Sequence, residues 1–102
     1  MSSKRWRIQY LSVANRDLIE IVDYIKADNP VAASELLDKI DASISRLENM
    51  PHSGKIPDDV RLKAMGYRIL VVGNHLIFYV VTGNRVEIRR VLHGKRNYGF
   101  LL

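Results

Sequence analysis

The residues best suited to chemistry stand together near the C-terminus. An apolar, β-branched segment is followed directly by His93-Gly94-Lys95-Arg96-Asn97-Tyr98. A histidine exchanges a proton near neutral pH, and lysine and arginine bind anions through their charge and N–H donors. A strand that ends in such a cluster favours contact with an anionic partner.

Each residue of the cluster also has a purely structural interpretation. His93 either exchanges protons or caps a backbone carbonyl at the strand end. Lys95 and Arg96 either hold phosphates or acidic side chains, or form a solvated basic terminus. Tyr98 either stacks on a base or packs against the sheet together with Phe100. The residue types alone do not decide between these alternatives.

Other candidate residues are more scattered. Arg68 opens a predicted strand, where it either points into a free face of the sheet or remains a surface cation. His52 and His75 have no second ligand at metal-binding spacing, so no metal site is expected. The chain contains no Ser/His/Asp set, phosphate loop or glycine-rich dinucleotide fingerprint, so no cofactor is expected either.

The length and composition predict one globular domain over residues 1–102, because 47% of the residues are hydrophobic. The absence of cysteine excludes disulfides and thiolate zinc sites and is compatible with the cytoplasm. The longest apolar runs are strand-length, and none follows Lys4 and Arg5. Neither a membrane span nor a signal peptide is therefore expected.

Charge is distributed unevenly along the chain, whose formal net charge is +5. Residues 12–50 are rich in acids, whereas residues 61–96 carry many cations against Glu87 alone. The positive charge thus gathers in the predicted sheet half. This half suits nucleic acid or an acidic protein as its partner.

The first half of the chain predicts one strand and two helices. Residues 6–10 alternate between apolar and polar side chains, which predicts a strand. Ser12 then offers an N-cap for a helix of about four turns, and Asp17 falls on its polar side. Asn29 and Pro30 are typical of the N-cap and first position of a second helix. The short joint predicts that the two helices fold back on each other.

The second half predicts three strands over residues 67–72, 75–81 and 85–92, after a polar loop with a helical turn near residues 58–64. Gly73-Asn74 is able to adopt the positive φ angles of a tight hairpin, and Thr82-Gly83-Asn84 predicts a three-residue connection. Strict alternation places Arg85, Glu87, Arg89, Val91 and His93 on one face of the last strand, and Val86, Ile88, Arg90 and Leu92 on the other. The second, more apolar face is expected to meet the helices, which leaves His93 near the open face.

Together these elements predict an α+β fold with the order β-α-α-β-β-β. A helical hairpin is expected on one face of a largely antiparallel sheet, and the opposite face or one end is expected to be free for binding.

From residues 10 to 98 the chain resembles the ParE branch of the RelE/ParE toxin superfamily. The resemblance is carried by Leu18-Ile19-Glu20-Ile21-Val22-Asp23-Tyr24-Ile25, Arg46-Leu47-Glu48-Asn49-Met50-Pro51-His52-Ser53-Gly54, Gly66-Tyr67-Arg68, His75-Leu76-Ile77-Phe78-Tyr79-Val80-Val81 and Val86-Glu87-Ile88-Arg89-Arg90-Val91-Leu92-His93. Each segment is weakly specific alone, but their order and spacing match the family.

The resemblance implies a cytoplasmic toxin of a type II toxin–antitoxin module, of the kind also called plasmid stabilisation proteins. A cognate antitoxin would hold it inactive, and the resemblance allows a homodimer or a toxin–antitoxin heterotetramer. ParE-type toxins inhibit DNA gyrase, whereas RelE-type toxins cleave mRNA on the ribosome. A non-catalytic nucleic-acid-binding domain is the third interpretation.

The motif residues favour gyrase. A RelE-type endonuclease would draw on Arg68, His93, Arg96 and Tyr98, but Leu70 and Leu76 occupy positions where those nucleases carry cations. A base, a phosphate clamp and an acid are needed together for RNA cleavage. Under the gyrase interpretation no residue is catalytic, and His93, Lys95 and Arg96 contact the target.

Overall fold

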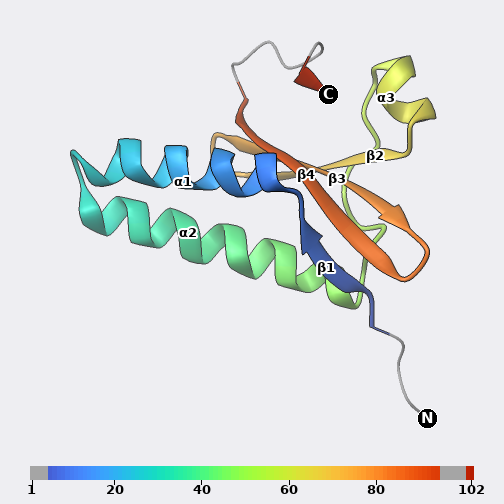
Figure 1. The fold of residues 1–102 in the computed structure, drawn as a ribbon, viewed down its shortest axis with the longest axis horizontal. Helices are drawn as coiled ribbons and strands as arrows, with labels where there is room; N and C mark the ends of the chain where they lie inside the picture. The colour runs from blue at the N-terminus through green and yellow to red at the C-terminus, as the bar shows by residue number, and fades with distance from the viewer. Residues whose placement is uncertain (1–4, 95–100) are drawn as a thin grey trace.

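The computed structural model describes residues 5–94 and 101–102, and in it a helical hairpin lies against one face of a four-stranded sheet (Figure 1). In chain order the elements are β1 (Arg7–Tyr10), α1 (Ser12–Lys26), α2 (Pro30–Ser45), the 3-10 helix η1 (Arg46–Glu48), α3 (Val60–Ala64), β2 (Tyr67–Val72), β3 (His75–Thr82) and β4 (Arg85–His93). The predicted α+β class and strand–helix order are confirmed, including the helical turn in the polar loop.

The sheet is mixed rather than purely antiparallel. Its strand order is β1-β4-β3-β2, with antiparallel pairing throughout except between β1 and β4. Those two strands run parallel, and Ile8 lies opposite Val86. A parallel pair needs a long crossover connection, and the chain from the helical hairpin through β3 supplies it.

Helix α1 begins without the side-chain cap that the sequence suggested. Ser12 is the first helical residue, Leu11 occupies the N-cap position, and no side chain caps this end. The expectation of a Ser12 cap was wrong because the backbone N–H of Leu11 still donates to the carbonyl of Ile88 at 3.0 Å. Pairing with β4 therefore holds Leu11 extended at the N-cap position, and the helix starts one residue earlier than a Ser12 cap would require.

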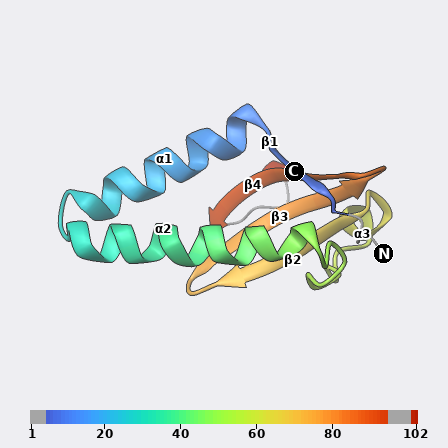
Figure 2. The ribbon, with the colours of Figure 1, turned by 90° about the horizontal axis from the view of Figure 1, so that it is seen from below.

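The start of α2 follows the prediction. The Asn29 Oδ1 accepts a hydrogen bond from the backbone N–H of Ala32 at 3.1 Å, and Pro30 takes the first helical position. Helices α1 and α2 lie side by side on the sheet, and their joint extends beyond the ends of the strands (Figure 2). Their inner faces bury Ala14, Ile40 and Ile44 against the sheet.

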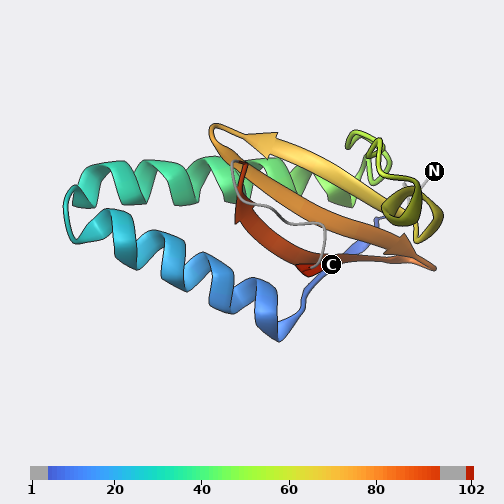
Figure 3. The same cartoon turned by 90° about the horizontal axis from the view of Figure 1, so that it is seen from above.

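Apolar side chains are buried on both faces of the sheet. The helix-covered face holds Ile77, Tyr79, Val86 and Ile88 among others. The opposite face holds a second cluster of Leu62, Tyr67, Ile69, Phe78, Val80 and Leu92. Helix α3 and residues 101–102 lie over this second face (Figure 3), so it is partly covered rather than free.

Both hairpins use two-residue connections with glycine first. Gly73 and Gly83 have φ angles of +57° and +59°, whereas no described non-glycine residue has a positive φ. Asn74 therefore does not share the conformation of Gly73, and the pattern is that of a type II′ turn. The three-residue connection predicted at Thr82 was wrong, because Thr82 already pairs with Arg85.

A β-bulge in β4 changes which side chains face the helices. Phe78 pairs with Arg90 and Tyr79 pairs with Ile88, so Arg89 is an extra residue without a direct partner. One extra residue reverses the alternation of all the residues that follow. Val91 consequently packs in the helix-side cluster and Leu92 in the opposite one.

The loop after η1 is fastened to the sheet by one buried tyrosine. The Tyr79 hydroxyl donates to the carbonyl of Pro51 and accepts from the backbone N–H of Gly54, both at 2.8 Å. A Cβ atom on Gly54 would lie 2.4 Å from the Tyr79 oxygen. Because Tyr79 is fully buried, the hydroxyl has little room to move away.

We therefore expect Gly54→Ala to lower the free energy of unfolding by about 1–3 kcal/mol, as overpacking of a close contact typically does. Urea denaturation of the purified protein measures the loss. Ser53→Ala is the matched control, because Ser53 is exposed in the same loop. Equal stability of the two variants would show that the Tyr79 contact does not constrain the loop.

Candidate functional site

The structure places His93 and Arg68 but not the rest of the predicted site. Lys95, Arg96 and Tyr98 lie outside the described residues, as does Phe100. His93 is the last residue of β4 and is exposed on its helix-covered side. The expectation that it lies near the open face was wrong, because the extra residue Arg89 reverses the alternation beyond Ile88.

His93 lies directly opposite His75 on the neighbouring strand. The two residues are register partners, and their rings meet edge to face with centroids 5.3 Å apart. A regular hairpin that starts from the Thr82–Arg85 pair would have placed His75 opposite Leu92. The pairing of the two histidines was therefore missed from the sequence, since it depends on the bulge.

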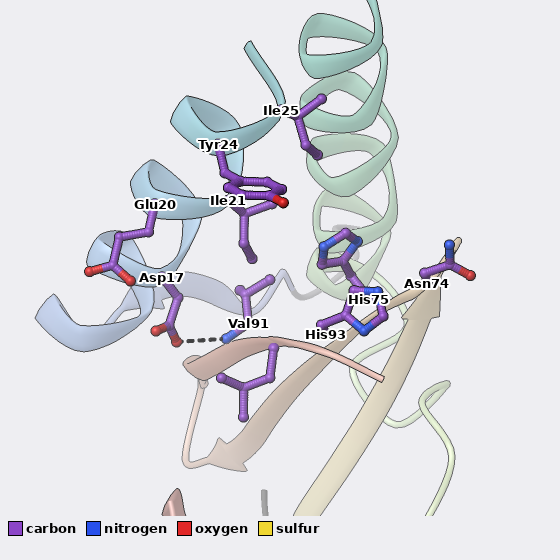
Figure 4. A pocket seen from close by; sticks show the side chains of 10 residues that line it. Asp17, Glu20, Ile21, Tyr24, Ile25, Asn74, His75, Val91 and His93 are labelled. Carbon is purple, nitrogen blue, oxygen red and sulfur yellow. Dashed lines mark hydrogen bonds between the residues drawn. The ribbon is translucent and has the colours of Figure 1, made fainter. Parts of the chain in front are cut away.

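The histidine pair lines a pocket of about 500 Å³ between α1 and the ends of β3 and β4 (Figure 4). Helix α1 contributes Asp17, Glu20, Ile21, Tyr24 and Ile25, and the sheet contributes Asn74, His75, Val91, Leu92 and His93. Aliphatic side chains thus form its walls, while carboxylates and imidazoles supply its polar groups. A pocket of this size and composition is typical of a binding site.

Burial changes the acid–base behaviour of His75. Desolvation lowers the pKa of its imidazole below the usual value, and the nearby His93 lowers the pKa further. Within the described residues, the buried Nδ1 of His75 has no hydrogen-bond partner. The neutral form of His75 is therefore favoured in the folded protein.

Asp17 fixes α1 to the bulged part of β4. Its carboxylate accepts hydrogen bonds from Arg90 Nε at 2.7 Å, from a terminal guanidinium nitrogen of Arg90 at 2.9 Å, and from the backbone N–H of Val91 at 3.0 Å. Asp17 is buried, although its position on the helical wheel predicted a polar, outward face. The hydrogen bond and charge of Asp17 raise the pKa of Arg90, so the guanidinium stays charged.

Arg68 has a structural position. Its guanidinium donates to the carbonyls of His52 at 3.0 Å and Gly54 at 3.1 Å, which joins β2 to the loop after η1. Arg68 pairs with Tyr79, and His93 pairs with His75 four positions further along β3. At the usual rise of a strand this separates the two sites by roughly 13 Å along β3, and they also lie on strands that flank β3 on opposite sides.

The other described cations of β4 gather around Glu87. Its carboxylate binds Arg85 at 3.1 Å and Arg89 at 2.9 Å. The Arg89 guanidinium also lies over the Tyr67 ring, 5.7 Å from its centroid. These contacts balance part of the positive charge that the sequence concentrates in the sheet half.

In the described residues the site combines one imidazole pair with an aliphatic wall. Arg68 does not join it, because its guanidinium is bonded to two loop carbonyls. In the described ranges, no three His, Cys, Asp or Glu side chains are grouped closely enough to hold a metal ion. No helix of the described chain has the length and apolarity to cross a membrane.

Comparison with known proteins identifies the family. The profile of the "ParE toxin of type II toxin-antitoxin system, parDE" matches residues 8–98. The chain belongs to this ParE toxin family. Curated relatives called "Toxin ParE1", from two Mycobacterium tuberculosis strains, CDC 1551 / Oshkosh and H37Rv, are 37% identical over 62 residues. That match covers 60% of this chain and 60% of the length of each relative.

Solved structures share the ParE-like fold. The "Chromosomal ParDE TA system from P. aeruginosa" contains a chain with a TM-score of 0.73 and 19% identity, covering 89% of this chain and 98% of that one. The toxin–antitoxin complex RelBE2 from Mycobacterium tuberculosis gives a TM-score of 0.59 with 18% identity, covering 87% and 98%. At these identities the likeness concerns the fold.

We expect Asp17→Asn to lower the free energy of unfolding by about 2–4 kcal/mol, because it removes the hydrogen-bonded counter-ion of the largely buried Arg90. A double-mutant cycle with Arg90→Gln, followed by urea denaturation, should give a coupling of about 1 kcal/mol or more. Asp23→Asn is the control, since Asp23 is an exposed carboxylate on the same helix. If the two losses of unfolding free energy were additive, the Asp17–Arg90 ion pair would not stabilise the fold.

Stability should fall as the pH drops below about 6.5, the ordinary histidine value. The lowered pKa of His75 means that the unfolded chain takes up a proton at a pH where the folded chain does not. The contribution of neutral His75 to the free energy of unfolding is complete above about pH 6.5 and is lost as the pH falls through the lowered pKa of the folded state. In urea denaturation series, His75→Asn should flatten this pH dependence, whereas the exposed His52→Asn should follow the parent protein. If the stability of His75→Asn fell with pH as steeply as that of the parent protein, His75 would not be the group responsible.

Proposed function

We propose that this protein is the toxin of a type II toxin–antitoxin module, acts in the cytoplasm as a single domain, and inhibits DNA gyrase while a cognate antitoxin neutralises it. Membership of the ParE family over residues 8–98 supports the toxin role. The solved relatives are toxin–antitoxin systems by their titles, which supports an antitoxin as partner.

One observation supports gyrase over mRNA as the target: the two described residues of the nuclease interpretation, Arg68 and His93, lie apart. Arg68 is bound to two loop carbonyls, whereas His93 lies beside His75 in the pocket under α1. Leu70 packs against the helix-side cluster and Leu76 against the opposite one. Inhibition of gyrase by binding requires no proton transfer by the toxin, so it does not need such a centre.

The target contact is proposed to involve His93 with Lys95 and Arg96, the basic residues that follow it. These residues continue the cationic half of the sequence and give the strand end a charge that suits an acidic surface. The runner-up remains a ribosome-dependent mRNA endonuclease that uses Arg68, His93, Arg96 and Tyr98.

Induced expression separates the two functions. We expect His93→Gln to retain growth arrest, because glutamine keeps hydrogen-bonding capacity and no proton must move. Reversal of charge at Lys95 and Arg96 to Glu should relieve the arrest, whereas reversal at the exposed Lys39 of α2 should not. Supercoiling assays with gyrase and ribosome-dependent cleavage assays are run on the same purified variants.

Two outcomes would overturn the proposal. Ribosome-dependent cleavage that His93→Gln reduces about 10²–10⁴-fold, with gyrase unaffected, would establish the nuclease. A protein that is harmless on induction and whose nucleic-acid affinity falls steeply with salt, without target preference, would be a plain binding domain. Co-expression with the adjacent reading frame tests the antitoxin, which should co-purify and relieve the arrest.

A further inference from the structure

The pocket under α1 is distinct from the basic strand end in its charge. Its acidic lining residues, Asp17 and Glu20, both come from α1, and none of its described lining residues is Lys or Arg. Asp17 is already occupied by Arg90 and by the backbone of Val91. Glu20 is exposed and, within the described residues, accepts no hydrogen bond, although its charge, after that of Asp17, also acts on the Arg90 guanidinium. The oxygens of its carboxylate therefore remain available to hydrogen-bond a ligand.

The walls of the pocket are apolar and partly open to solvent. Ile21 and Ile25 from α1 lie across the pocket from Val91 of β4. Tyr24 stands at the edge with 84% of its surface exposed, an unusually large exposure for an aromatic side chain. A volume of about 500 Å³ accommodates a large side chain such as leucine, phenylalanine or tryptophan.

We propose that this pocket binds a segment of a protein partner in which a large apolar side chain lies beside a lysine or arginine. The apolar side chain would enter between Ile21 and Val91, and the cation would pair with Glu20 at the rim. Exposed Tyr24 would cover the inserted group and lose its contact with water. In many interfaces a buried apolar anchor supplies most of the affinity, and a charge at the rim fixes the orientation of the partner.

Charge complementarity selects the partner. Both carboxylates that line the pocket come from α1, and none of its described lining residues is Lys or Arg, so its rim favours a cationic group on the partner. This inference rests on the proposed function only in expecting a protein partner, since the pocket itself is a feature of this chain.

Short capped peptides test the pocket directly. The full chain, labelled with ¹⁵N, is titrated with Lys-Ala-Trp-Lys, Glu-Ala-Trp-Glu and Lys-Ala-Ala-Lys, and chemical shifts are followed by NMR. The first peptide should bind in the millimolar range and shift the amides of Ile21, Val91 and His93. It should bind about two- to fivefold more tightly than the Glu peptide, the usual effect of one exposed ion pair. The peptide without tryptophan should bind most weakly.

Variants of exposed residues identify the groups responsible without threatening the fold. Glu20→Gln should remove the preference for the lysine-flanked peptide, whereas Glu35→Gln, an exposed carboxylate of α2, should keep it. Tyr24→Ala should weaken both tryptophan peptides. Shifts outside the pocket, no saturable binding, or an equal affinity for the Glu peptide would overturn the proposal. Loss of growth arrest on induction would instead count against the toxin role, so the two failures are distinguishable.

Discussion

The carboxylate of Asp17 ties helix α1 to the last strand at the point where that strand bulges. Three hydrogen bonds converge on it, two from Arg90 and one from the Val91 backbone. A buried carboxylate is stable only when its charge is paired and its oxygens are hydrogen-bonded. This constraint fixes the position of α1 over the sheet, and with it the wall of the pocket that α1 contributes.

The bulge and the ion pair depend on each other. The extra residue Arg89 moves Arg90 to the face opposite the helices, from which its side chain still reaches Asp17. The same shift turns Val91 and His93 towards α1. Even-numbered residues of β4 therefore face the helices before the bulge, and odd-numbered residues do so after it. Bulges commonly redirect a side chain next to a binding site, and here one redirects His93 into contact with His75.

The polar side chains at the two ends of the sheet consequently differ in what they contact. Near the start of β2, Arg68 and Tyr79 bind loop backbone, and their polar groups are used for structure. Near the end of β4, an imidazole pair and the exposed carboxylate of Glu20 line an open pocket. Burial, and then the neighbouring His93, lower the pKa of His75, which disfavours a charge inside that pocket.

The sequence by itself determined the α+β class, the strand and helix order, the Asn29 cap and the family, because these follow from periodicity, turn residues and ordered local motifs. It also indicated His93 as a site residue. Only the tertiary structure decided the Leu11 cap position, the burial of Asp17 and the partnership of His93 with His75. Each of these depends on pairing between distant segments: the parallel β1–β4 contact, the α1–β4 ion pair and a one-residue bulge. Local propensity carries no information about such register, since one inserted residue turns every following side chain of the strand to the other face of the sheet.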